Sequence, residues 1–66
     1  MNDDLPTLPE LGDALRLYLV DRGIGLREAE RELGISKATL SRACRGMNMS
    51  ATHYRALVKK VWLPAN

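Results

Sequence analysis

The side chains of this 66-residue chain that could do chemistry are its cations, because they gather where anions are missing. Residues 33–66 contain no Asp or Glu and carry six bases, namely Lys37, Arg42, Arg45, Arg55, Lys59 and Lys60. Residues 1–32 hold all eight acids and four arginines, so the two parts have formal charges of −4 and +6. A surface of one sign attracts polyanions such as nucleic acid. A solvated basic face without a partner is the alternative.

Other kinds of chemistry have little support in the residue types or their spacing. His53 and Cys44 could ligate a metal, but two ligands do not make a zinc site. The carboxylates of Glu28, Glu30 and Glu32 lie beside Arg27 and Arg31, which is typical of a salt-bridged helix face rather than of an acid–base pair. We recognise no catalytic Ser/His/Asp or Cys/His arrangement and no Gly-rich phosphate loop. We therefore expect no enzyme, no metal, no cofactor and no small-molecule ligand.

Length and composition limit the architecture to one small domain. A chain of 66 residues buries only about 60% of its unfolded surface, so its core is marginal and oligomerisation would help. The single cysteine cannot form an internal disulfide, which favours a cytoplasmic protein over a secreted one. The acidic N-terminus and the lack of an apolar run of about 20 residues predict neither a signal peptide nor a membrane span.

The local sequence predicts four helices and no strand. A favourable N-cap precedes each helix and Gly or Pro follows it: the caps are Thr7, Gly25, Ser36 and Ser50, and the stops are Gly23, Gly34, Gly46 and Pro64. Glu10 completes a capping box with Thr7. The predicted helices are 8–22, 26–33, 37–44 and 51–63, and they follow a flexible acidic tail over residues 1–7.

The two middle helices are predicted to pack against each other and to leave a basic face bare. The residues expected to point inward are Ala29, Leu33, Leu40 and Ala43. Gly34 permits a sharp turn between the helices, and Ile35 fills the angle between them. The first turn and outer face of residues 37–44 then stay hydrophilic and basic, which suits entry into a DNA major groove.

Residues 26–46 contain Gly-Ile-Ser at 34–36, Thr-Leu-Ser-Arg at 39–42 and a closing Gly46. This pattern resembles the helix-turn-helix of the Cro/phage-repressor family, which is also called XRE-like. The resemblance extends over most of the chain. It implies an all-α, compact four-helix bundle of the Cro/C1 repressor-like kind, whose third helix reads the major groove.

Two features depart from the family pattern. Glu30 occupies a position in the second helix where the family usually has a small residue, and its carboxylate could pair with Ser41 or Arg42. A pair with Arg42 would fix or mute that side chain as a base reader. The other departure is a missing fifth helix, which often contributes to the family's dimer contact.

The resemblance also implies roles for individual residues. By this resemblance, base edges are read by Lys37, Ala38, Ser41 and Arg42. The expected phosphate contacts are Arg27, Ser36, Thr39, Arg45, Asn48, Ser50 and His53. Arg42 could donate two hydrogen bonds to guanine, and Ala38 could contact a thymine methyl group. The alternative for Arg42 is a surface arginine that pairs with acids of the second helix.

The partners expected from this interpretation are double-stranded DNA and a second copy of the chain. Trp62 and Leu63 are the predicted dimer interface, because a short monomer leaves little to cover them. Two recognition helices about 34 Å apart would fit an inverted-repeat operator. The resemblance suggests a small repressor at the nucleoid of a bacterium, encoded by the bacterium or a phage. The alternatives are a module that binds a second regulatory protein, such as an antirepressor, and an architectural protein without base preference.

Overall fold

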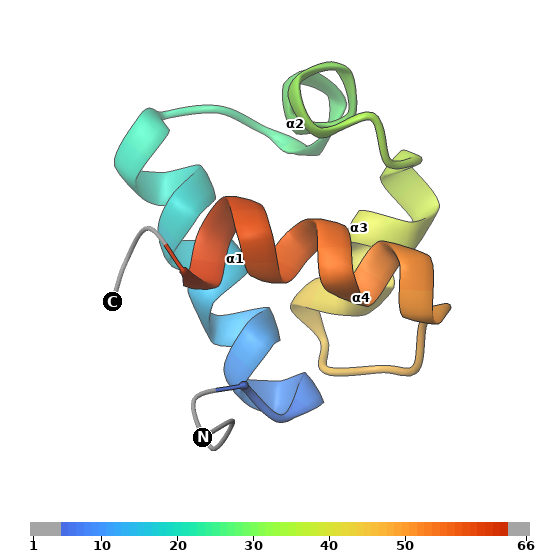
Figure 1. Ribbon diagram of the computed structural model, residues 1–66. Coiled ribbons are helices and arrows are strands. Elements are labelled where there is room, and N and C mark those ends of the chain that lie inside the picture. The colour runs from blue at the N-terminus through green and yellow to red at the C-terminus, as the bar shows by residue number, and fades with distance from the viewer. Residues whose placement is uncertain (1–4, 64–66) are drawn as a thin grey trace.

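The computed structural model describes residues 5–63, and this part of the chain is all-helical, without a strand (Figure 1). The helices are α1 (Leu8–Arg22), α2 (Leu26–Leu33), α3 (Lys37–Cys44) and α4 (Ala51–Leu57), and α4 continues directly into the π-helix η2 (Val58–Trp62). The predicted bounds of the first three helices are confirmed. Residues 1–4 and 64–66, which include the predicted stop at Pro64 and most of the predicted tail, lie outside the described part.

The predicted helix 51–63 differs from the structure in its second half. The α-helix ends at Leu57, and the next turn is wider: the N–H of Leu63 donates to the carbonyl of Val58 over 2.9 Å, five residues back. Leu57, Val58 and Val61 are all buried. The spacing of these apolar residues suits both helix types, so hydrophobic periodicity alone could not predict the change.

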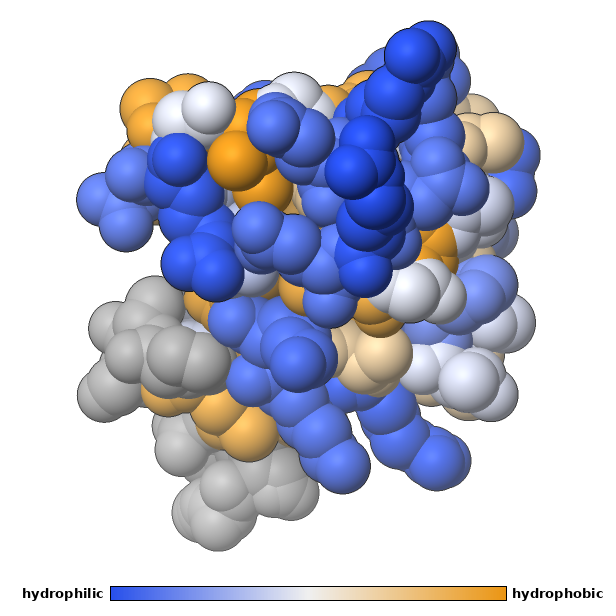
Figure 2. All heavy atoms as spheres, turned by 90° about the horizontal axis from the view of Figure 1, so that it is seen from above, coloured by the Kyte–Doolittle hydropathy of each residue, from blue (hydrophilic) through white to orange (hydrophobic). Residues whose placement is uncertain are grey.

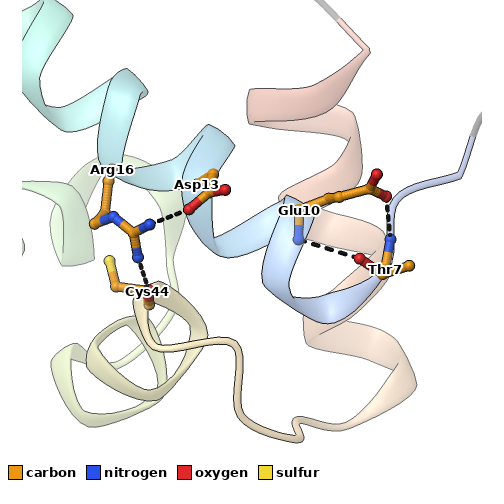
Figure 3. Close-up of polar contacts among 5 residues, drawn as sticks. All are labelled: Thr7, Glu10, Asp13, Arg16 and Cys44. Carbon is orange, nitrogen blue, oxygen red and sulfur yellow. Dashed lines mark hydrogen bonds and ion pairs between the residues drawn. The ribbon is translucent and has the colours of Figure 1, made fainter.

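The start of α1 shows how local sequence sets a helix boundary. The N–H of Glu10 donates to the Thr7 hydroxyl over 3.2 Å, and the Thr7 N–H donates to the Glu10 carboxylate over 2.8 Å (Figure 3). These two bonds form the predicted capping box and satisfy N–H groups that have no partner within the helix.

The predicted loose tail extends too far. Pro6 is buried, and its carbonyl accepts a hydrogen bond of 2.6 Å from the Tyr54 hydroxyl of α4. Residues 5–7 therefore belong to the folded domain. The sequence did not reveal this contact because its two residues are 48 positions apart.

The core is formed by all the helices around the inner side of α1. Its buried apolar residues are Leu11, Leu15, Ala29, Ile35, Leu40, Ala43, Leu57, Val58 and Val61. α1 packs against both α3 and η2, and α2 packs against α3 (Figure 1). The inward positions predicted for Ala29, Leu40 and Ala43 are confirmed, whereas Leu33 is only partly buried.

α1 and α3 approach closely at Gly12, a contact that the sequence did not predict. A Cβ atom on Gly12 would lie 2.5 Å from the carbonyl oxygen of Ala43 and 3.0 Å from that of Cys44. One turn later, the Arg16 guanidinium donates to the Cys44 carbonyl and to the Asp13 carboxylate (Figure 3). Because Gly12 has no side chain, the C-terminal end of α3 can lie directly on α1. The guanidinium of Arg16 then binds it there.

Candidate nucleic-acid interface

The connection between α2 and α3 fixes the position of α3. Gly34 has a φ of +69°, which L-residues with side chains rarely adopt, and its N–H donates to the Glu30 carbonyl over 2.9 Å. Ile35 follows and is only 3% exposed. Ser36 then caps α3, because its hydroxyl accepts a hydrogen bond of 3.3 Å from the Thr39 N–H. This short turn leaves the first residues of α3 at the surface.

The outer face of α3 carries the residues predicted to read bases. Lys37, Ala38 and Arg42 are exposed, and Ser41 is half-buried. The opposite face of the helix, with Leu40 and Ala43, is fully buried in the core. The four predicted base readers therefore share one side of a helix whose other side is fixed.

Arg42 is not held by the acids of α2. Within residues 5–63 the ion pairs are Arg16–Asp13 and Arg22–Glu32, and no hydrogen bond of the Arg42 guanidinium is found in this part of the chain. Glu30 likewise pairs with neither Ser41 nor Arg42 there. The described residues therefore contain no ion pair between Glu30 and Arg42. The hydrogen-bond donors of the exposed Arg42 guanidinium are available to a ligand.

Thr39 does not fit the phosphate contact expected for it. The residue is 6% exposed, and its hydroxyl oxygen accepts a hydrogen bond of 3.0 Å from the Ser36 hydroxyl. It therefore lies on the buried side of α3, next to the turn. The reason is its place in the helix: Thr39 precedes the fully buried Leu40 and is three residues from its cap, where a threonine can bond within its own turn.

The other expected phosphate contacts lie on both sides of α3. Arg27 is exposed in the first turn of α2, and Arg45 and Asn48 are exposed in the connection 45–50. Ser50 accepts a hydrogen bond of 3.2 Å from the N–H of the half-buried His53, so both of these residues also have a capping role. Arg27 and Arg45 are accessible to a ligand, whereas the hydroxyl of Ser50 already accepts a hydrogen bond within the protein.

A carboxylate occupies the N-terminus of α2, where Arg27 is expected to contact a phosphate. The Glu28 carboxylate accepts a hydrogen bond of 3.2 Å from the Gly25 N–H. This carboxylate occupies a position where a bound phosphate would gain from the helix dipole, and its charge opposes a second anion. The contribution of α2 to anion binding therefore depends on Arg27.

The charges of the two parts of the chain have different environments. Arg22 donates to Glu32 over 3.3 Å and stacks over the Tyr18 ring at 4.9 Å, and the nearby Glu32 carboxylate raises the pKa of Arg22. By contrast, all six cations of residues 33–63 are exposed and form no ion pair within the described residues. The face over α2 is also mainly hydrophilic, with apolar atoms between the polar side chains (Figure 2).

A second basic area lies on α4 and η2, and the sequence had not predicted that its residues group together. Arg55, Lys59 and Lys60, with Thr52 and Ala56, line an open hollow of about 310 Å³. Their spacing of four and one residues along a helix was the signal that could have grouped them.

The predicted dimer residues have unequal exposure. Leu63 is 53% exposed, whereas Trp62 is half-buried and packs against the core. Only Leu63 of the two presents most of its apolar side chain to a partner. Trp62 contributes to the domain itself.

Residues 5–63 offer no arrangement typical of a metal site. In this range no three His, Cys, Asp or Glu side chains come together as metal ligands would. None of its helices is long and apolar enough to cross a membrane.

Comparison of the chain with protein-family models, with curated proteins and with solved structures found no match. The functional argument therefore depends on the residues and their geometry.

Proposed function

We propose that this chain is a sequence-specific DNA-binding transcriptional regulator in which α2, the turn 34–36 and α3 act as a helix-turn-helix. One observation carries the proposal: the exposed face of α3 presents Lys37 and Arg42 without ion-pair partners in residues 5–63, while its opposite face is fixed in the core. An α-helix with its side chains is about 10–12 Å in diameter, and a B-DNA major groove about 12 Å wide admits it.

The proposed contacts follow from the chemistry of each exposed side chain. Arg42 donates two hydrogen bonds to O6 and N7 of a guanine, and Lys37 donates to the same kind of acceptor or to a phosphate. Ala38 permits close approach and contacts a thymine methyl group. Ser41 is a weaker base contact. Arg27 and Arg45 bind phosphates on either side and set the register of α3 in the groove.

The proposed regulator is a small repressor without catalytic activity. It acts by covering a promoter, because a domain of this size has little surface beyond that needed for DNA and a second subunit. As a dimer it would place two copies of α3 about one DNA turn, ~34 Å, apart on an inverted repeat. Its proposed location is the cytoplasm, at the DNA. The step from DNA binding to repression is an analogy with Cro-like regulators.

The first test is a selection of genomic DNA fragments with the purified protein at near-physiological salt, followed by sequencing of the bound DNA. An inverted repeat with half-sites about one turn apart is the expected result. Recovery of DNA without a common motif would support an architectural protein instead. Recovery of no DNA would overturn the proposal and favour a protein partner, as for an antirepressor.

Arg42→Ala then tests the reading residue on the selected site. The expected loss is about 1–3 kcal/mol of binding free energy, with relaxed preference at one base position. Arg31→Ala is the matched control, because Arg31 is also an exposed arginine without an ion pair in residues 5–63 but lies on α2. Equal losses from both variants would contradict base reading by Arg42.

A further inference from the structure

The outward side of α1 carries two large apolar side chains that the fold does not use. Leu17 is 69% exposed and Val20 is 77% exposed, and their spacing of three residues puts them next to each other on the helix. Neither belongs to the core or packs against it. Adjacent exposed apolar side chains on a small domain favour a protein contact.

Acidic residues surround this apolar pair. Glu10, Asp13 and Asp21 are exposed on the same side of α1 at helical spacing. Arg16 neutralises Asp13 in part, since the two side chains form an ion pair, and the Glu10 carboxylate also accepts the capping hydrogen bond from the Thr7 N–H. We call Leu17, Val20 and these three acids the α1 face. Its chemistry fits a partner with apolar atoms at the centre and cations at the rim.

The hollow on α4 and η2 has that complementary chemistry. Arg55, Lys59 and Lys60 are exposed and have no ion pair within residues 5–63, and Ala56 adds apolar surface between them. Leu63, four residues after Lys59, extends this surface with a side chain that is 53% exposed. Together these residues form the α4–η2 face.

We propose that two copies of this chain associate through these faces, so that the α1 face of each copy contacts the α4–η2 face of the other. α1 and η2 pack against each other within one copy (Figure 1). In the proposed dimer, a two-fold axis between the copies forms each contact twice. The association joins opposite charges and covers Leu17, Val20 and Leu63. None of these residues belongs to the outer face of α3, so the inference stands independently of DNA binding.

A nucleic-acid backbone is a poorer occupant of the α4–η2 face. Phosphates would pair with its three cations, but they would leave Leu63 and the apolar pair of α1 uncovered. A second copy satisfies both surfaces with residues of the same chain. This difference gives the two occupants distinct experimental signatures.

Sedimentation equilibrium of the purified protein without DNA tests the inference. The unmodified chain is expected to form dimers whose dissociation constant rises with salt, because the contacts are partly electrostatic. Asp21→Lys changes the α1 face and Lys60→Glu changes the α4–η2 face. Each variant alone is expected to weaken self-association roughly tenfold, since each reverses a charge at both contacts of the dimer.

An equimolar mixture of the two variants is the decisive sample. Within a mixed dimer, the new cation at position 21 of one variant meets the new carboxylate at position 60 of the other, and the native residues meet at the second contact. The mixture is therefore expected to recover the affinity of the unmodified chain. Arg31→Glu makes an equal change of charge on α2, outside both faces, and is expected to leave the dissociation constant unchanged.

Three results would overturn the inference. The first is a monomer at every concentration, and the second is a mixture that associates no better than either variant alone. The third is an unchanged dissociation constant for Lys60→Glu together with weaker DNA binding, which would assign the α4–η2 face to phosphates. Circular dichroism of each variant shows whether it has kept the helical fold. Failure of the fragment selection alone would leave this inference intact.

Discussion

The charged residues of the first two helices and those of the later helices differ in what they contact. In residues 5–32, Arg16 binds Asp13 and the end of α3, Arg22 binds Glu32, and Glu10 and Glu28 bond to backbone N–H groups. In residues 33–63 every cation is exposed and none has an ion pair within the described chain. Several charges of the first region thus stabilise the fold, whereas no cation of the second forms an ion pair within the described residues.

The net charge of each part does not show whether its charges are paired in the folded chain. A basic half could have been neutralised by acids folded onto it, and the Glu30–Arg42 pair was one such arrangement. Instead, Glu10 and Glu28 accept hydrogen bonds from backbone N–H groups at helix starts, and Glu32 of α2 binds Arg22 of α1. No acid of the described residues pairs with a cation of residues 33–63. The positive field of α3, α4 and η2 is therefore not cancelled locally, which is what a binder of polyanions or of acidic protein surfaces requires.

The largest effect is expected from a change at the contact between α1 and α3. Gly12→Val is expected to lower the free energy of unfolding by about 3 kcal/mol, because its side chain collides with the carbonyl of Ala43. Urea unfolding followed by circular dichroism measures the loss. Gly25→Ala is the control, since a Cβ there has nothing within 4 Å. Equal stability of Gly12→Val and the native chain would refute the close approach.

A smaller loss is expected from Arg16→Ala. This change removes the hydrogen bond to the Cys44 carbonyl and the ion pair with Asp13, both at the surface, and should cost about 1 kcal/mol of unfolding free energy. Arg31→Ala should change stability by less than about 0.5 kcal/mol, because Arg31 is exposed and has no ion pair in the described residues. A similar effect of both changes would mean that the bond to α3 adds nothing.

Lys37→Ala tests the second region, whose cations are expected to affect DNA binding rather than stability. Its stability should stay within about 0.5 kcal/mol of the native value, because the side chain is exposed and has no ion pair in residues 5–63. If Lys37 binds phosphate, the slope of log binding constant against log salt should fall by about 1. Fluorescence anisotropy at several salt concentrations measures the slope. A large loss of stability would place Lys37 among the residues that hold the fold.

The smallest expected effect concerns Cys44, at the junction of the two regions. Burial raises the pKa of this thiol, and Arg16 lowers it to a lesser extent. A raised pKa in the folded state contributes stability below the ordinary thiol pKa, and that contribution is lost as pH rises through the raised value. The native chain should therefore lose slightly more stability than Cys44→Ala as the pH rises above about 8.5, the ordinary thiol pKa. Equal pH dependence of the two would contradict the burial.

Much of the helical structure could be predicted because its signals are local. Thr7 with Glu10, Ser36 and Ser50 begin their helices as their chemistry requires, and Gly34 ends α2 with the expected positive φ. Each of these signals acts within about one helical turn, so sequence spacing is enough to find it.

The tertiary contacts could not be predicted in the same way. Three of these contacts join residues that are far apart in the chain. They are the close approach of Gly12 to α3, the hydrogen bond from Arg16 to Cys44 and the hydrogen bond from Tyr54 to Pro6. Thr39 is a different case, because its contact is local: the residue is 6% exposed, and its hydroxyl accepts a hydrogen bond from the Ser36 hydroxyl within the same turn. The exposed face of α3 was predictable, because Leu40 and Ala43 had to point into the core and Lys37, Ala38 and Arg42 lie on the opposite side of the helix.

The central position of α1 has a consequence for synthesis on the ribosome. α1 emerges first, but its buried side is covered by α3 and by η2, whose residues are translated later. Helices of this length gain little stability alone in water. A nascent chain that ends before Val61 would therefore leave Leu11 and Leu15 incompletely covered, and folding should become cooperative only when the last helical turn is free of the exit tunnel.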